Sequence, residues 1–175
     1  MVVLSEGNLQ FRFGASCLAE KYDDWSFFRN QFQSTCGGAK AVDIICISNN
    51  TSWFIEIKDY RQHARTKPQD IGNEIAIKVR DTLAGLVAAK MNANEPDERD
   101  FAQKVLESKA IKVVLHLEQP LKHSKLFKRA IDPAAVKQSL KRLLHAIDAH
   151  PCVVDKNSLS VNRDWVVTSR ISEGA

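Results

Sequence analysis

Short apolar runs along the chain predict several strands. Residues 41–47, 52–58 and 111–118 are rich in Ile, Val, Phe, Leu and Trp, and polar residues bound each run. Side chains of this kind fit the pleated surface of a sheet, so we expect strands there. Residues 8–14 have a similar but shorter pattern, which fits a short strand or an extended lead-in, and residues 166–170 fit a last, short strand.

Other segments repeat their apolar side chains at steps of three and four, which is typical of one helix face. Residues 15–33 and 71–91 have this pattern, and Asp70 is expected to cap the second of these helices. We expect shorter helices over 98–108 and 133–150, the last with Asp132 as its cap and Pro133 in its first turn. An order that mixes helices and strands in this way indicates an α/β layered domain.

Three ionisable residues interrupt the first two long strands. Asp43 lies in the first, and Glu56 and Lys58 lie in the second. Asn49 and Asn50 suit a two-residue hairpin turn, because Asn tolerates positive φ. Such a turn, or a four-residue loop, places Asp43 opposite Glu56 with Cβ atoms about 5 Å apart, whereas an odd-length loop shifts the register by one.

Two facing carboxylates repel each other, so they need a shared proton, a cation or a metal ion beside them. Lys58 can neutralise only one of the two charges. A pair of carboxylates suits Mg²⁺, which could activate a water molecule, and Mn²⁺ is an alternative ion. The competing interpretation is an ordinary Lys–Glu pair on a strand surface. The apolar flanks of both strands and the even register favour the site.

The composition is that of a normal globular domain, with 175 residues, 44% hydrophobic and 26% charged. The chain is expected to form a single domain over residues 1–175. Its four cysteines lack metal-binding spacing, which favours reduced thiols in a cytoplasmic protein. The first residues do not have the pattern of a signal peptide, and no apolar run approaches the ~20 residues of a membrane span.

Charge is unevenly distributed along the chain. Residues 1–60 have two more acids than bases, whereas residues 119–145 have seven bases and one acid. This division suits an acidic metal site beside a track for a polyanion. A solvated basic helix face is an equally good interpretation of the second segment.

The hairpin resembles a known signature. Asp43, a spacer and then Glu56-Ile57-Lys58 at the end of a hydrophobic strand is similar to the motif of the PD-(D/E)xK nuclease superfamily. The run over 41–61 is similar in particular to Holliday-junction resolvases and small restriction-like nucleases. The resemblance covers about residues 15–118 and implies a restriction-endonuclease-like αβββαβ core, a mixed sheet flanked by helices, with a basic helical C-terminal extension. The first strand of the family's meander is not evident before Ala41.

The resemblance also implies roles for individual residues. Asp43, Glu56 and the carbonyl of Ile57 would bind Mg²⁺, and Lys58 would position the attacking water. Glu20, in the expected first helix, would complete the catalytic set, with Glu6, Asp23 and Asp24 as alternatives. Lys78 or Gln69 would match a Lys or Gln that some families carry near the site in the second helix.

DNA is the expected partner, and the basic residues near the hairpin and after the third long strand are the expected contacts. They are Arg61, His63, Arg65 and Lys67 in the loop, then Lys122, Lys125, Lys128 and Arg129, with Lys137, Lys141 and Arg142 extending the track. Ordinary solvation of the loop is an equally good interpretation of the first group.

The predicted function is hydrolysis of DNA phosphodiesters by a metal-dependent nuclease. The alternative is a nuclease-like fold that no longer cuts and acts as a nucleic-acid-binding or assembly module. Because a chain of this length has little room for a separate recognition domain, we expect a homodimer or a targeting partner protein.

Overall fold

The computed structural model describes residues 1–63, 65–120, 131–158 and 163–170, and it contains two β-sheets and three α-helices. The predicted basic residues Lys122, Lys125, Lys128 and Arg129 lie outside the described residues. The mixed α/β class predicted from the sequence is confirmed.

The larger sheet has five strands in the order β3-β4-β5-β6-β7. Its strands are β3 (Leu18–Lys21), β4 (Ile44–Ser48), β5 (Thr51–Asp59), β6 (Ala110–Glu118) and β7 (Cys152–Val154). The first three are antiparallel, and β6 and β7 continue the sheet in parallel. The middle strands are buried on both faces, by the helices on one side and by the smaller sheet on the other, so they have nearly continuous apolar runs.

The smaller sheet joins the two ends of the chain. It has the order β1-β2-β8, with β1 (Val2–Glu6), β2 (Leu9–Phe13) and β8 (Trp165–Ser169), all antiparallel. Strands β1, β3 and β7 were not predicted from the sequence. They are short, and their burial is only partial.

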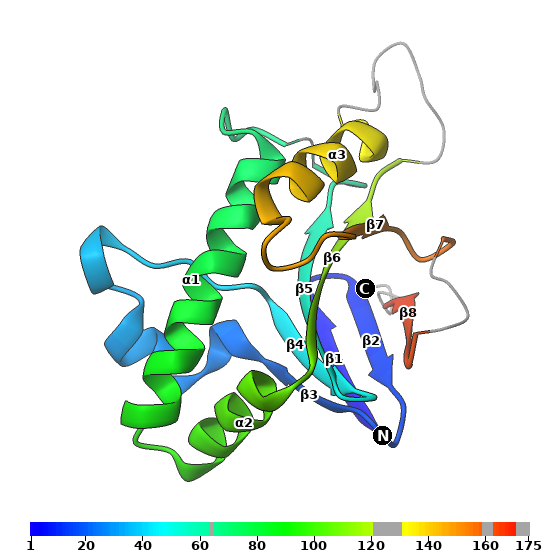
Figure 1. Cartoon of the computed structure of the whole chain (residues 1–175). Coiled ribbons are helices and arrows are strands. Elements are labelled where there is room, and N and C mark those ends of the chain that lie inside the picture. Colours follow the sequence, from blue (N-terminus) through cyan, green and yellow to red (C-terminus); the bar gives the residue numbers. More distant parts are fainter. Residues whose placement is uncertain (64, 121–130, 159–162, 171–175) are drawn as a thin grey trace, which may run out of the picture.

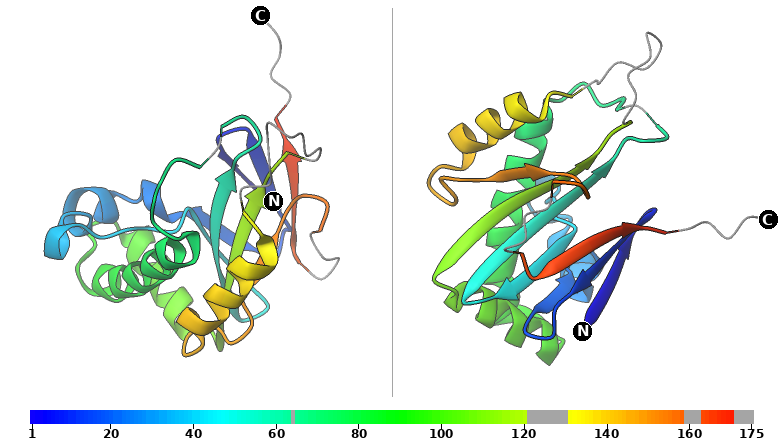
Figure 2. Two further views of the ribbon diagram at one scale, coloured as in Figure 1. Left: turned by 90° about the horizontal axis from the view of Figure 1, so that it is seen from above. Right: turned by 90° about the vertical axis from the view of Figure 1, so that its right-hand side faces the viewer.

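The three helices lie together on one side of the larger sheet, and the smaller sheet lies on the other side (Figures 1 and 2). They are α1 (Ile71–Asn92), α2 (Pro96–Glu107) and α3 (Pro133–Leu144). Asp70 and Asp132 cap α1 and α3 by accepting hydrogen bonds from the amides of Asn73 and Ala134, as predicted. Helix α3 ends at Leu144, earlier than the predicted residue 150.

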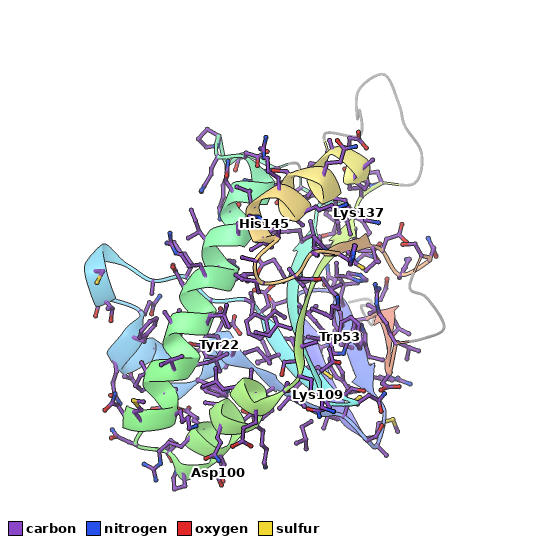
Figure 3. All side chains as sticks on the ribbon, viewed as in Figure 1. Tyr22, Trp53, Asp100, Lys109, Lys137 and His145 are labelled. Atoms are coloured by element: carbon purple, nitrogen blue, oxygen red, sulfur yellow. The ribbon has the colours of Figure 1, made fainter. Side chains whose placement is uncertain are left out.

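Two apolar cores separate these three layers (Figure 3). The first lies between the helices and the larger sheet and includes Ile45, Phe54 and Leu115 together with Ile75 of α1. The second lies between the two sheets and includes side chains of β2, Ile44 and Ile55. Alternate residues of β4 and β5 therefore face different cores, as the two-residue period of a strand requires.

The helix predicted over 15–33 is wrong. Residues 18–21 form β3, which pairs with β4, and short helical turns follow at Tyr22–Asp24, Phe28–Phe32 and Thr35–Gly37. The apolar side chains that suggested a helix are nonetheless buried, because Tyr22 and Phe28 pack into the first core from these turns. The buried carboxylate of Glu98 accepts from the amides of Ser26 and Phe27 at 2.6 and 3.0 Å.

Of the helices in the described part of the chain, none is long and apolar enough to cross a membrane. All four cysteines are free: Cys17 and Cys46 are buried, Cys152 is half-buried and Cys36 is exposed.

Candidate functional site

The hairpin of β4 and β5 brings Asp43 and Glu56 together. Asn49 and Asn50 both have positive φ, of 50° and 57°, and the tight turn pairs Ser48 with Thr51 and Ile44 with Ile55. The predicted even register is therefore confirmed. One residue beyond the last pair, Asp43 lies beside Glu56, on the face that points to α1.

Two lysines neutralise these buried carboxylates. Lys78, which projects from α1, lies 2.6 Å from Glu56 Oε1 and 3.4 Å from Asp43 Oδ1. Lys58 lies 2.7 Å from the same Glu56 oxygen. The amide of Ile57 donates to Asp43 Oδ2 at 2.6 Å. The two carboxylates thus share one face and one cation. Because Glu56 and Asp43 are buried, the interpretation of the motif as an ordinary Lys–Glu pair on a strand surface is wrong.

Burial dominates the titration of this cluster. It raises the pKa of Glu56 to about 7, and repulsion from Asp43 adds to the rise, while Lys78 and Lys58 oppose it. Burial also raises the pKa of Asp43 against the opposing effect of Lys78 and of the Ile57 amide. Burial alone would lower the pKa of Lys58, but the carboxylate of Glu56 raises it overall. The lysines therefore stay charged, and Glu56 can gain a proton close to neutral pH.

A third carboxylate, Glu74 in the first turn of α1, contacts three cationic side chains of the site. Glu74 is only 7% exposed. Its Oε1 lies 3.1 Å from Lys67 Nζ and 3.3 Å from Lys58 Nζ, and its Oε2 lies 2.8 Å from Arg65 Nη2. Burial acts to raise the pKa of Glu74, but the bond from Arg65 and the charges of Lys58 and Lys67 lower it to about 2. Glu74 is therefore ionised at any physiological pH.

Sequence reasoning did not single out Glu74, and it gave Lys78 only as one of two candidates in the second helix. Both lie on the buried stripe of α1, beside Ile75 and Val79. Two charges four residues apart on the apolar face of a helix are the signal that could have found them. Gln69, the other candidate, precedes α1 and takes no part in the carboxylate cluster. The main chain of Gln69 accepts from Arg65.

Glu20 does not join the cluster. It lies on β3, pairs in register with Ile45, and accepts from Trp25 Nε1 at 2.8 Å. The expectation that a first helix carries it into the site is wrong, because that helix does not form. Of the alternatives, Glu6 pairs with Lys21 at 2.8 Å and Asp24 pairs with Lys21 and Arg29.

Among the alternative acids, Asp23 is the one whose pKa is raised by the charge of Asp43. Burial, together with repulsion from the Asp43 carboxylate, raises its pKa to about 6. Among the described residues its Oδ1 is buried without a hydrogen-bond partner. The amide of the neighbouring Tyr22 donates to the main-chain oxygen of Asp43 at 3.1 Å, which places this segment beside Asp43.

The predicted basic residues of the loop divide into two groups. Arg61 turns back to Asp59, whose carboxylate it contacts at 2.5 Å, and it also donates to Ser169 of β8. His63, Arg65 and Lys67 instead line a pocket of about 290 Å³ at the end of β5, together with Lys58. Arg65 is thus not an ordinary solvated side chain of the loop. It also donates to the phenol oxygen of Tyr60.

The residues present do not fit a resident divalent ion in this arrangement. Glu56 Oε2 has no hydrogen-bond partner in the described part of the chain, but the other three carboxylate oxygens of Asp43 and Glu56 already contact ammonium or amide groups. Within the described ranges no group of three or more His, Cys, Asp or Glu side chains is arranged to hold a metal. Mg²⁺ at Asp43, Glu56 and Ile57 stays a prediction, and no chemical step is derived through it.

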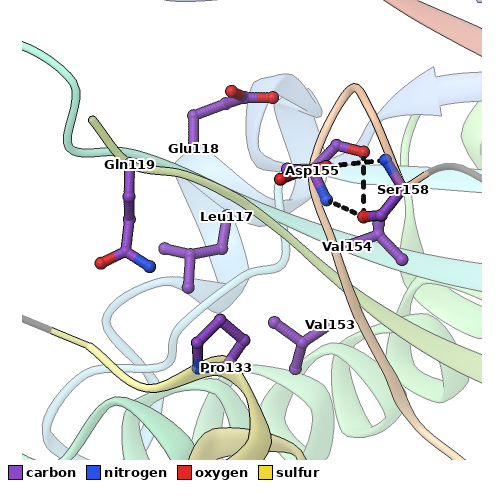
Figure 4. A pocket seen from close by; sticks show the side chains of 8 residues that line it. All are labelled: Leu117, Glu118, Gln119, Pro133, Val153, Val154, Asp155 and Ser158. Atoms are coloured by element: carbon purple, nitrogen blue, oxygen red, sulfur yellow. Dashed lines mark hydrogen bonds between the residues drawn. The ribbon is translucent and has the colours of Figure 1, made fainter. Parts of the chain in front are cut away.

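A second pocket, between β6, β7 and the start of α3, is a weaker candidate. It measures about 60 Å³, and Figure 4 shows Asp155 and Ser158 bonded to each other at its edge. Glu118 beside it accepts from the main chain of Lys156 and lies 3.0 Å from His116. With its polar groups satisfied and little space, this pocket suits a water molecule rather than a substrate.

Comparisons with known proteins give one informative relative. No family model matches the chain, and no solved structure matches it. The chain is 34% identical over 165 residues to a cysteine--tRNA ligase of Neisseria meningitidis serogroup A / serotype 4A. The similarity covers 77% of this chain and 24% of the ligase.

This relative corrects the functional prediction. It is named as a ligase and not as a nuclease, so the predicted hydrolysis of DNA, and with it the classification of the chain as a nuclease and hydrolase, is wrong. At the site, lysines from β5 and α1 neutralise the carboxylates, and Glu20 lies elsewhere. The chain spans about a quarter of the length of the ligase that it matches.

Proposed function

We propose that this chain is an accessory RNA-binding module that holds tRNA for a partner that charges it. The observation that carries the proposal is its 34% identity to part of a protein named as a cysteine--tRNA ligase. The described residues support a binding role, because they place cationic side chains around an open pocket and along an exposed helix.

The pocket at the end of β5 supplies the first contact. Lys58, Arg65 and Lys67 converge there on Glu74, and His63 lies at the same pocket. Cationic side chains that are held in position bind phosphate oxygens with little further loss of conformational entropy.

Helix α3 supplies the second contact. Lys137, Lys141 and Arg142 are exposed on it. A hollow of about 310 Å³ is lined by Arg65 of the loop and by Ala135 and Val136 of α3, so it adjoins both basic regions. The acids Asp70 and Asp132, which cap α1 and α3, also line it. An RNA backbone that crosses this hollow would meet both basic regions, and such contacts give affinity without reading the sequence.

Three further predictions fit this proposal and remain proposals. A restriction-endonuclease-like core is supported by the order of β3, β4, β5, α1 and β6 along the chain, since these four strands are neighbours in the larger sheet. The proposed role of this fold is to bind tRNA. The predicted targeting partner is then a ligase, and the predicted cytoplasmic location is the place where such a ligase works.

The test is the affinity of the chain for a tRNA transcript, measured by fluorescence anisotropy at about 50 mM and 200 mM salt. We expect binding that weakens steeply with salt. The double replacement Lys141→Glu and Arg142→Glu should weaken it about tenfold or more, because each reversal turns an attraction for phosphate into a repulsion. The exposed Lys104 on α2, at the far end of the helical layer, is the matched control, and Lys104→Glu should change the affinity less than about twofold.

A DNA duplex of similar length separates the proposal from the predicted DNA partner. Tighter binding of the duplex than of the tRNA would contradict a tRNA-binding role. Failure of the tRNA to bind at the lower salt concentration would contradict it as well.

A further inference from the structure

The pocket at the end of β5 has features that an ordinary backbone-binding surface lacks. Its inner side is formed by β5 itself, through Ile57, Lys58 and Asp59, and its outer side by the loop that carries His63, Arg65 and Lys67. The groups that can meet a ligand therefore come from two segments, the end of the strand and the loop that follows it.

Three cationic groups converge in this pocket from separate positions. Lys58, Arg65 and Lys67 all lie within 3.3 Å of the buried carboxylate of Glu74. Lys67 is still 64% exposed, so its ammonium group can contact a ligand without leaving its place. Arg65 is fixed further by Tyr60.

The number of these cations matches a particular ligand group. A phosphate monoester has three terminal oxygens and up to two negative charges, whereas an internal phosphodiester has two free oxygens and one charge. Asp59, the other carboxylate at the pocket, is already paired with Arg61. A dianion gains about twice the Coulomb energy of a monoanion from the same cations.

We propose that this pocket binds a terminal phosphate monoester of an RNA chain. The inference rests on the proposed RNA-binding function and specifies the part of the RNA that this pocket recognises. Glu74 acts as a positioning residue: it holds the three cationic side chains converged before the ligand arrives. The same chemistry is present at a 5′-phosphate and at a 3′-phosphate.

The test compares one RNA hairpin prepared with a 5′-phosphate, with a 3′-phosphate, or with hydroxyl groups at both ends. Fluorescence anisotropy should show one phosphorylated form binding about tenfold more tightly than the hydroxyl form. The phosphorylated end that gains affinity identifies the source. Lys67→Gln should abolish the preference, and Lys104→Gln on α2 should retain it.

The outcomes separate the two proposals. Equal affinity for all three hairpins would overturn recognition of the terminal phosphate and leave the RNA-binding function standing. A preference that survives Lys67→Gln would overturn the assignment to this pocket. Absence of binding by every hairpin would overturn both proposals.

Discussion

Replacement of Lys78 by Met is expected to lower the free energy of unfolding by about 3–5 kcal/mol at about pH 8. Lys78 contacts both Glu56 and Asp43, and Glu56 is fully buried. Without this ammonium group, two buried carboxylates share Lys58 alone. The pKa of Glu56, already raised to about 7 by burial, should rise further, so the variant should recover stability as the pH falls below neutral and Glu56 gains a proton.

Urea unfolding at about pH 8 and about pH 5.5 measures both effects. Lys90 lies exposed near the end of the same helix, and Lys90→Met should cost less than about 0.5 kcal/mol. The double variant Lys78→Met with Glu56→Gln should regain part of the loss, because it removes one of the uncompensated charges. A loss below about 1 kcal/mol for Lys78→Met at the higher pH would show that the buried ion cluster is not formed as described.

Glu74 is expected to produce the largest pH dependence of stability in the acid range. Its pKa is lowered to about 2 in the folded chain, from 4.5 in the unfolded chain. Its contribution is therefore fully present above about pH 4.5 and is lost as the pH falls towards 2. The lowered pKa corresponds to about 3 kcal/mol at neutral pH. Glu74→Gln should lose stability of this order at about pH 7 and should approach the wild type near pH 2.

The difference between wild type and Glu74→Gln, followed by urea unfolding across this range, isolates the effect. Asp43 and Glu56 titrate in both proteins and cancel in the comparison to first order. Glu107 on α2 is exposed and serves as the control, and Glu107→Gln should give a small difference at every pH. A difference for Glu74→Gln that stays constant from pH 7 to pH 2 would mean that its three cationic partners do not bind the carboxylate.

The sequence predicted the hairpin well because its signals are local. Asn49 and Asn50 determine the turn, the turn determines the register, and the register places Asp43 beside Glu56. The caps Asp70 and Asp132 were also predictable, because a cap depends on its immediate neighbours.

The segment before β4 could not be predicted, because its structure depends on distant partners. β3 forms by pairing with β4, and Glu98 of α2 binds the amides at the start of the turn near Phe27. Apolar spacing alone cannot distinguish this arrangement from a helix when the same side chains are buried in both. Glu20 was misplaced for the same reason.

Only part of the cluster of Asp43, Glu56, Lys58, Lys78 and Glu74 could be predicted from the sequence. The face shared by Asp43, Glu56 and Lys58 follows from strand alternation. Their neutralisation by Lys78 and the gathering of cations by Glu74 require α1 to pack across the sheet at one particular rotation. That rotation is set by the first core, which involves residues far apart in the chain.

Hydrogen–deuterium exchange with and without saturating tRNA tests whether RNA binds to the face formed by the loop after β5 and by α3. RNA bound to the proposed face should slow the exchange of amides in residues 57–67 and in α3, and leave β1, β2 and β8 unchanged, because the smaller sheet lies on the opposite side of the larger one. Protection confined to β1, β2 and β8, or no protection anywhere at saturation, would contradict the account.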